Sequence, residues 1–325
     1  MQILVGEDSP PARSGFQAAI GRALAQAWQA AGHRVIRLNP DRLQTAGPAG
    51  RNDSLDEAVA KTLDEHPLAR VHLLTTGPVA RSVAAHCRGR GRPFTSSSDR
   101  IDNCKLAQQA AESIHAHATC VITPTRAAAQ RLATAGIRAT RVIRPGVDAA
   151  VFQPRVYRFM NLPRPLTLLF GATLDGKDLR DYLDTDLPGS RLVYAPGWTG
   201  HSSQGAVELI GYRAPHELAH LISAADISLI PDAGPESILL AMQSLACGVP
   251  IASRPNAQLE ELLCNGELGS QRELLRDAVI EGLQANRQVC RAFASRHAWA
   301  ATARQVLATG LVGETLNSYA DRDVA

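Results

Sequence analysis

The sequence predicts an α/β protein with two domains, each built around a doubly wound, mostly parallel sheet. Three observations support this fold class: a length of 325 residues, a composition with 45% hydrophobic and 20% charged residues, and short β-branched runs that alternate with alanine-rich stretches. A domain commonly holds about 100 to 150 residues, so the length suits two hydrophobic cores. The composition supports packed cores and excludes disordered or fibrous classes.

Strands and helices alternate through the first half of the chain. The first strand is expected at 3–6, and a Pro/Gly turn leads from it to a helix at 16–31. Further strands are expected at 34–38, 71–75, 93–96, 120–123 and 141–144, with helices at 54–64, 79–87, 105–117 and 126–135. Because parallel strands need crossover helices, this alternation indicates a doubly wound sheet.

A proline-rich stretch at 152–165 interrupts the pattern, and a new strand at 166–170 restarts it. We therefore expect a domain boundary there, with domains at 1–155 and 156–325. Further strands are expected at 191–195, 207–209, 227–230 and 250–252, with helices at 177–182, 215–224, 237–246 and 259–264. A final helical region at 286–310 is expected to run back toward the first domain.

Targeting and metal signals are sparse. No apolar stretch approaches the roughly 20 residues that span a bilayer, and the N-terminus does not read as a signal peptide. The six cysteines are scattered without a C-x-x-C pair or a histidine at ligand spacing. We expect reduced thiols that mostly fill the core, no metal site, and a cytoplasmic protein that is soluble or peripheral to a membrane.

The two halves of the chain differ in charge. Residues 1–155 carry 20 Lys and Arg against 12 Asp and Glu, or +8, which leaves 14 against 19, or −5, for 156–325. A run of three arginines within five residues, Arg88-Gly89-Arg90-Gly91-Arg92, marks a flexible basic loop. Clustered positive charge draws anionic partners, although an arginine-rich composition would produce a similar excess.

Two glycine-containing turns are candidate phosphate sites. Gly171 to Lys177 matches the G-x-x-x-x-G-K core of a P-loop, but Asp178 stands where Ser or Thr should hold magnesium, which argues against an ATPase. Lys177 can still meet a diphosphate as a point charge, or it is an ordinary surface lysine. Gly15 lies in the first strand-to-helix turn, where it serves an anion site or simply the turn.

Two blocks of sequence resemble glycosyltransferase family 4. The first runs through Ile122-Thr123-Pro124-Thr125, Gly136-Ile137, Val142-Ile143-Arg144-Pro145-Gly146-Val147-Asp148 and Phe152-Gln153-Pro154. The second runs from Gly211-Tyr212-Arg213 through Glu217-Leu218 and Ala224-Ala225-Asp226-Ile227 to Leu245-Ala246-Cys247-Gly248-Val249-Pro250. Pro93-Phe94-Thr95-Ser96 and Ala298-Trp299-Ala300-Ala301 are similar to the subgroup that transfers mannosyl or sulfoquinovosyl units to lipids.

The resemblance implies a GT-B fold: two Rossmann-like domains with an interdomain cleft and a C-terminal helix that returns to the first domain. It also implies a UDP- or GDP-sugar donor bound by the second domain, an acceptor bound by the first, and no cofactor or metal. Gly171, Gly211 and Ser237 fall in the donor-binding segments. The acceptor is expected to be anionic, either a lipid phosphate at a membrane surface or nucleic acid with a hydroxylated base.

This sequence departs from the family at several positions that bear the chemistry. The family's E-x(7)-E motif, in which the first carboxylate contacts the sugar and the second the ribose, aligns with Pro235 and Gln243. Glu236, one residue later, is the candidate for the first role, and Gln243 can still hydrogen-bond a ribose hydroxyl. The alternative for Glu236 is an ordinary first-turn glutamate favoured by the helix dipole.

Two further family positions are altered. The family's Arg–Lys pair on the diphosphate aligns with Ala172 and Lys177, and its acceptor-side histidine aligns approximately with Asp99. Asp99 is a candidate to orient or deprotonate the acceptor hydroxyl, or it is a loop carboxylate that faces solvent. Two hypotheses follow: a divergent transferase that acts with retention at the anomeric carbon, and a non-catalytic GT-B binding protein.

Overall fold

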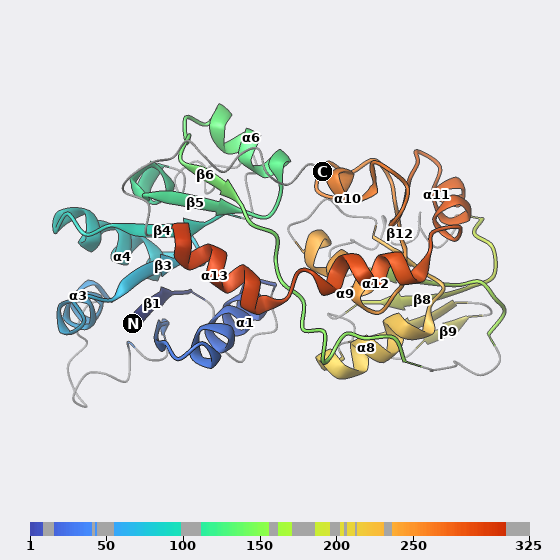
Figure 1. Ribbon diagram of the computed structural model, residues 1–325, viewed down its shortest axis with the longest axis horizontal. Helices are drawn as coiled ribbons and strands as arrows, with labels where there is room; N and C mark the ends of the chain where they lie inside the picture. Colours follow the sequence, from blue (N-terminus) through green and yellow to red (C-terminus); the bar gives the residue numbers. More distant parts are fainter. Residues whose placement is uncertain are drawn as a thin grey trace. The chain divides into compact units, whose positions relative to one another are not determined.

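The chain forms two compact units in the computed structural model (Figure 1). The structure describes residues 1–8, 16–40, 43, 55–98, 112–155, 162–170, 186–195, 202–204, 207–211, 213–230 and 236–309. One unit consists of Met1–Arg144 with the segment that begins at Trp299, and the other is Pro145–Ala298.

The first unit contains a six-stranded sheet in which all pairings are parallel. Its strands are β1 (Gln2–Gly6), β2 (Arg34–Leu38), β3 (Arg70–Leu73), β4 (Phe94–Ser97), β5 (Cys120–Thr123) and β6 (Thr140–Val142), in the order β2-β1-β3-β4-β5-β6. The helices are α1 (Phe16–Ala30), α3 (Leu55–Glu65), α4 (Pro78–Gly89), α6 (Arg126–Thr134) and the short 3-10 helix His115–His117. Most of the helix expected at 105–117 lies outside the described residues.

Both faces of this sheet are covered, as expected for a parallel sheet. The alternation of side chains along β1 directs Ile3 and Val5 into a core that includes Trp28 of α1. Leu4 points to the opposite face and packs in a core with Val59 of α3 and residues of α4. All three β1 side chains are fully buried.

Local sequence explains the bounds of α6. The Thr125 side chain accepts a hydrogen bond from the amide of Ala128 (3.2 Å), which caps the first turn. Gly136 adopts a φ of +86°, which favours glycine, and the helix closes with a bond from the Ile137 amide to the Leu132 carbonyl (2.9 Å). Leu132 and Ile137 pack with Val121 of β5, so the helix is fixed against the edge of the sheet.

The C-terminal helix α13 (Trp299–Thr309) belongs to the first unit, so the predicted return of this helix is confirmed. It packs against α1, and the Trp28 indole N–H donates to the Ala303 carbonyl (3.0 Å). Arg70 donates to the Leu307 carbonyl (2.8 Å), and the Thr302 hydroxyl donates to the Arg144 carbonyl (3.2 Å). Arg70 thus places a cation at the negative end of the helix.

The final helical region expected at 286–310 is divided into two helices. The region consists of α12 (Arg287–Ser295) and α13, separated by Arg296, His297 and Ala298. Ala298 forms a parallel bridge with Val147, whose amide donates to the His297 carbonyl (2.8 Å). This pairing holds the chain in an extended conformation and ends α12.

The second unit contains a seven-stranded sheet. Its strands are β7 (Leu166–Phe170), β8 (Ser190–Tyr194), β9 (Ser202–Gln204), β10 (Val207–Ile210), β11 (Ile227–Leu229), β12 (Ile251–Ser253) and β13 (Gly269–Gln271), in the order β13-β12-β11-β7-β8-β10-β9. Among the described strands of this sheet, only β9 and β10 pair in an antiparallel manner. The helices are α8 (Pro215–Ala224), α9 (Ser237–Ala246), α10 (Glu260–Leu263), α11 (Leu275–Gly282) and α12.

The segment 145–155 groups with the second unit, whereas the expected division was 1–155 and 156–325. Val147 and Phe152 are buried in the largest core of the second unit, together with Leu166 and Leu168 of β7. The Ser223 hydroxyl of α8 donates to the Gln153 carbonyl (3.2 Å). These contacts explain why residues 145–155 pack with the second sheet.

Most described cysteines fill the core, as expected. Cys87, Cys247 and Cys290 are fully buried. Burial raises the pKa of each of these thiols to about 11, so they stay protonated and unreactive at neutral pH.

Candidate functional site

The second sheet has the strand order of a dinucleotide-binding fold. From β7 the chain moves outward to β8 and β10, then returns to β11 on the other side of β7 and continues to β12 and β13. Ligands of such sheets bind at the carboxyl ends of the strands where the order reverses, here between β7 and β11. β11 leads through 230–236 into α9, so the start of α9 lies at this switch point.

Helix α9 is buried on nearly all sides. The partly exposed positions between 236 and 246 are Glu236, Leu240 and Gln243. These residues are four and three apart, which places them on one stripe of a helix. The open stripe of α9 therefore carries both residues that the sequence assigned to the sugar and the ribose, about 10 Å apart along the axis.

Glu236 lies at the N-cap position of α9 with helical backbone angles (φ −70°, ψ −23°), and its side chain does not cap the helix. Ser237, the first helical residue, is 1% exposed. Amide groups in the first turn of a helix lack partners within the helix and attract negative charge. The start of α9 thus combines the positive end of a helix with the carboxylate of Glu236, the residue directly before the helix.

Gln243 carries an unsatisfied polar atom. Its Oε1 is shielded from solvent and accepts no hydrogen bond from any part of the chain that the structure describes. A buried acceptor without a donor is unfavourable by about 1 to 3 kcal/mol. A ligand hydroxyl at this position would supply the missing donor.

The other predicted donor residues have different outcomes. Gly211 directly follows β10 at the carboxyl edge of the sheet and is buried. Gly15, Asp99, Gly171, Lys177 and Pro235 lie outside the described residues. Gly171 directly follows the last residue of β7, Phe170.

A cation that we did not predict from the sequence lies at the carboxyl edge of the second sheet. Arg254 directly follows β12, which pairs with β11, so it lies one strand away from the start of α9. Strands of a sheet are about 4.8 Å apart, which an arginine side chain spans easily. The turn after it is ordered by Asn256, whose side chain accepts from the Gln258 amide (2.8 Å) and whose carbonyl accepts from Gln271 (3.0 Å). An arginine immediately after a buried parallel strand was the available signal.

The corresponding helix end in the first unit is filled by the protein itself. Its strand order reverses between β1 and β3, and α4 begins after β3. The Asp8 carboxylate accepts from the amides of Gly77 (2.8 Å) and Val79 (2.6 Å) at the start of α4, and also from the Thr75 hydroxyl. A Cβ at Gly77 would lie 2.4 Å from the Asp8 carboxyl carbon, so this contact requires glycine. Asp8 occupies the place that a phosphate would take.

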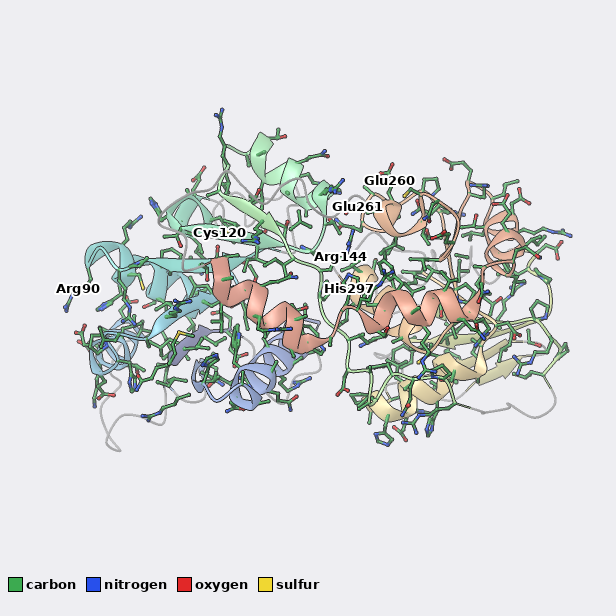
Figure 2. The ribbon with its side chains drawn as sticks, viewed as in Figure 1. Arg90, Cys120, Arg144, Glu260, Glu261 and His297 are labelled. Carbon is green, nitrogen blue, oxygen red and sulfur yellow. The ribbon has the colours of Figure 1, made fainter. Side chains whose placement is uncertain are left out.

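The arginines of the 88–92 loop are not a free basic surface. Arg92 donates to the carbonyls of Leu63 (3.0 Å), His66 (2.8 Å) and Ala69 (2.5 Å), which ties α3 to β3. Arg90 pairs with Asp64 (3.1 Å), and Figure 2 shows it at the outer end of α4. Arg88 lies 3.0 Å from the His117 ring. Arg92 therefore has a structural role, and the charge of Arg90 is neutralised by Asp64.

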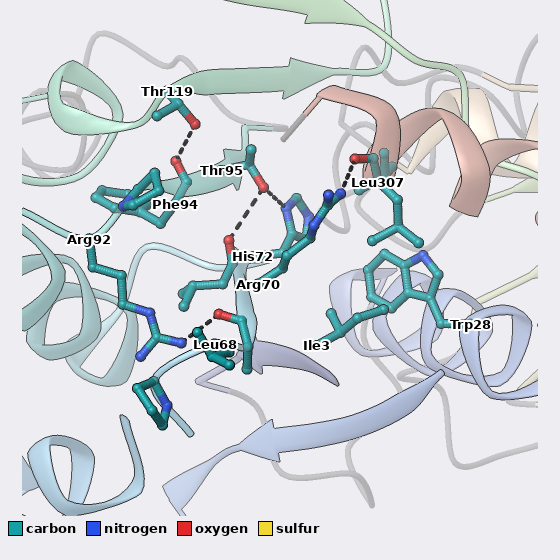
Figure 3. A pocket seen from close by; sticks show the side chains of 15 residues that line it. Ile3, Trp28, Leu68, Arg70, His72, Arg92, Phe94, Thr95, Thr119 and Leu307 are labelled. Carbon is teal, nitrogen blue, oxygen red and sulfur yellow. Dashed lines mark hydrogen bonds between the residues drawn. The ribbon is translucent and has the colours of Figure 1, made fainter. Parts of the chain in front are cut away.

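A cavity of about 260 Å³ lies in the first unit at the amino ends of the strands (Figure 3). Its polar groups are used within the protein: both ring nitrogens of His72 contact hydroxyls, those of Thr95 (2.8 Å) and Ser97 (3.0 Å). Burial lowers the pKa of His72 to about 4, so the ring is neutral. Arg70 and Arg92, which also line the cavity, bond backbone carbonyls. We therefore interpret it as part of the docking of α13.

Neither a metal site nor a membrane span is found in the described ranges. Within them, no three His, Cys, Asp or Glu side chains gather as metal ligands. No described helix is both long enough and apolar enough to cross a membrane.

Comparisons with known proteins identify the fold. No family model matches the chain, and neither does any curated protein sequence. Among solved structures, the Anabaena protein HepE in complex with UDP-glucose gives a TM-score of 0.74 at 16% identity, over 95% of this chain and 99% of that one. A glycosyltransferase from Rickettsia africae gives 0.70 at 13% identity, over 96% and 99%. Sucrose-phosphate synthase from Thermosynechococcus elongatus gives 0.69 at 18% identity, over 94% and 97%.

These similarities cover both units and nearly the whole length of each chain. The chain therefore has the GT-B fold, with two Rossmann-like sheets and a C-terminal helix that packs on the first unit. At identities below 20% the similarity establishes the fold, and function has to be argued from the site.

Proposed function

We propose that the chain is a glycosyltransferase that moves a hexose from a UDP- or GDP-sugar to a hydroxyl of an anionic acceptor. The observation that supports this proposal is the open stripe of α9, which carries the unpaired Gln243 oxygen and begins at Glu236 near the carboxyl edge of the second sheet. A ligand with hydroxyls and a diphosphate matches these groups. The HepE structure, which contains UDP-glucose, has the same fold.

The roles of the donor-binding residues follow from their chemistry. Gln243 accepts a hydrogen bond from a ribose hydroxyl, and Glu236 accepts one from a hydroxyl of the transferred sugar. The amides at the start of α9, around Ser237, meet the diphosphate. Lys177 and Arg254 provide the cationic partners of the phosphates, and Arg254 compensates for the alanine at position 172.

The glycines permit close approach of the backbone to the ligand. Gly171 and Gly211 each directly follow a strand whose carboxyl end faces the proposed donor site. Gly15, which the sequence places in the first strand-to-helix turn, is proposed as an anion site of the first domain.

In the reaction, the bond between the anomeric carbon and the phosphate oxygen breaks, and a bond to the acceptor oxygen forms. Negative charge develops on the departing nucleoside diphosphate, where the helix end, Lys177 and Arg254 oppose it. The proton of the acceptor hydroxyl passes to a base, for which Asp99 is the candidate. We propose retention at the anomeric carbon on the basis of the family resemblance.

A second candidate is a GT-B protein that binds a nucleotide sugar without transferring it. The observation that favours it is the absence of both motif carboxylates in register, because proline stands at 235 and glutamine at 243. A shift of one residue turns a side chain by about 100° around a helix. Glu236 therefore has to reach the sugar from a different direction than the residue it replaces.

A panel of nucleotide sugars tests both candidates. A ligand that binds only the folded protein raises stability with the logarithm of its concentration, so a bound donor shifts the thermal midpoint. We expect a UDP- or GDP-sugar to give a shift, followed by slow hydrolysis of that donor. A shift without hydrolysis or transfer would support the binding protein, and no shift at millimolar concentrations of any donor would refute a nucleotide-sugar site.

A further inference from the structure

The turn that carries Arg254 is tied to the neighbouring strand by one side chain. Residues 254–259 connect β12 to α10, and β12 pairs in parallel with β13. The amide nitrogen of Gln271 on β13 donates to the Ser253 hydroxyl (3.1 Å) and to the Asn256 carbonyl (3.0 Å). Because these two acceptors lie on either side of Arg254 in the sequence, Gln271 holds the backbone before and after this arginine.

The strand that carries Gln271 is itself fixed closely against β12. Gly269 has a φ of +145°, and a Cβ at this position would lie 1.9 Å from the Ile251 carbonyl oxygen. The Arg272 amide donates to the Ser253 carbonyl (3.2 Å), and helix α11 packs on both strands. The backbone of β13 is therefore a firm support for the Gln271 side chain.

The two arginines near this turn have different roles. The Arg272 Nε donates to the Glu281 carboxylate of α11 (3.0 Å), and another guanidinium nitrogen donates to the Gln271 carbonyl (2.7 Å). The charge of Arg272 is thus used within the protein. Arg254, by contrast, lies on the turn that the Gln271 amide holds at the carboxyl edge of the sheet.

Hydrogen bonds rather than packing orient the Gln271 side chain. A cavity of about 580 Å³ lies next to it, and Gln271 is partly exposed. The cavity is also lined by Glu260 and Leu263 of α10 and by Gly269 and Ser270 of β13. Because this space is open, apolar neighbours do not enclose the side chain there, and its two bonds to the turn fix its conformation.

We propose that Gln271 is a positioning residue that aims Arg254 at the phosphates of the donor. This inference rests on the proposed function, in which Arg254 opposes the charge of the diphosphate. Hydrogen bonds between a guanidinium and a phosphate depend on distance and angle, so a turn that moves loses them. In this role Gln271 acts through the backbone around Arg254 and does not itself contact the donor.

A double-mutant cycle tests this role, with binding of UDP and GDP to the full chain measured by isothermal titration calorimetry. R254Q removes a charge-assisted contact and should raise the dissociation constant by about 10- to 150-fold. Q271M keeps the approximate size of the side chain and removes both hydrogen bonds, so it should raise the constant by about 3- to 10-fold. In the R254Q background, Q271M should have no further effect.

Two more variants separate positioning from stability. S270A is the matched control on the same strand, because the Ser270 hydroxyl donates to Glu281 (2.8 Å) instead of to the turn. S270A should lower the thermal midpoint and leave the dissociation constants unchanged. S253A removes one of the two Gln271 bonds, so it should weaken binding less than Q271M does, and only when Arg254 is present.

Equal weakening by Q271M with and without Arg254 would overturn the proposal, because it would show a general effect on the fold. Unchanged affinity of Q271M or of R254Q, in a protein that binds UDP or GDP, would also overturn it and leave the proposed function intact. Failure of the wild-type protein to bind either nucleotide would refute the proposed function as well. If Q271M lacks a cooperative thermal transition, S253A decides by the same cycle.

Discussion

Replacement of Gln243 with methionine should stabilise the free protein and weaken donor binding at the same time. Methionine has nearly the shape of glutamine and carries no oxygen, so it removes the unpaired Oε1 without leaving a large cavity. An unsatisfied buried acceptor costs about 1 to 3 kcal/mol, and the partial exposure of Gln243 favours the lower end. A gain of about 1 kcal/mol raises the midpoint of a unit of this size by about 2 to 4 °C.

The same substitution removes the proposed acceptor for a ribose hydroxyl. A neutral hydrogen bond contributes about 0.5 to 1.5 kcal/mol, so the dissociation constant of the donor should rise by up to about tenfold. At a donor concentration of 100 times the wild-type dissociation constant, the stabilisation is about 2.7 kcal/mol for the wild type and about 1.4 kcal/mol for the variant. The donor-induced shift should therefore fall to about half.

Ser244 provides a matched control on the same helix. Its hydroxyl is also buried and lacks a partner among the described residues, but the residue is fully buried and adjoins the open stripe without belonging to it. S244A should raise the midpoint of the free protein and leave the donor-induced shift unchanged. If Q243M lowered the midpoint of the free protein, or if its donor-induced shift equalled that of S244A, the assignment of Gln243 to the donor would be refuted.

Three further predictions concern other groups. E236Q should reduce turnover strongly at an unchanged midpoint, whereas E217A, which removes the side-chain bond to the Ala214 amide at the start of α8, should cost stability and leave turnover intact; near-native turnover of E236Q would exclude a catalytic role. K177A should weaken donor binding more than K105A, by about 1.5 to 3 kcal/mol if the phosphate is partly desolvated, and equal affinities would remove Lys177 from the site. Because burial lowers the pKa of both His72 and His115 to about 4, the unfolded chain binds more protons between about pH 4 and 6.5; stability should be complete above that window and fall by up to about 3 kcal/mol for each histidine as the pH drops through it, and urea midpoints against pH would measure the sum.

The regular elements could be predicted because each is encoded locally. The strands expected at 34–38 and 166–170 match β2 and β7, and the mostly apolar run Leu166–Phe170 is buried at every position, as a strand covered on both faces requires. Helix α6 carries its own start at Thr125 and its own end at Gly136, so its bounds follow from capping chemistry. Among the strands with three residues, β6, β11 and β12 lie near expected strands, whereas β9 and β13 do not; Gly269-Ser270-Gln271 of β13 has no apolar run and pairs with β12.

Features that depend on contacts between distant residues could not be predicted. The break between α12 and α13 follows from pairing of Ala298 with Val147, far away in the chain. The three carbonyls that Arg92 binds come from the last turn of α3 and the turn after it, so a sequence rich in arginine and glycine resembled a free basic loop.

The candidate site shows the same division. Position 243 could be found from the family spacing, but only the structure reveals that its oxygen is buried and unpaired. The assignment of Glu236 to the sugar remains a prediction, because residues 231–235 before it lie outside the described ranges.

The two sheets of the chain have similar folds but different chemistry at their switch points. In the first sheet, Asp8 accepts the amides at the start of α4, and Glu7 beside it is 2% exposed and paired with Arg37 at 2.5 Å. A second anion there would be repelled by the Asp8 carboxylate, which already accepts hydrogen bonds from the amides at the start of α4. In the second sheet, the residue at the start of α9 does not cap its helix, so the positive end is not neutralised by Glu236 in the same way. This asymmetry supports the proposal that a donor diphosphate binds at the start of α9 and not at the start of α4.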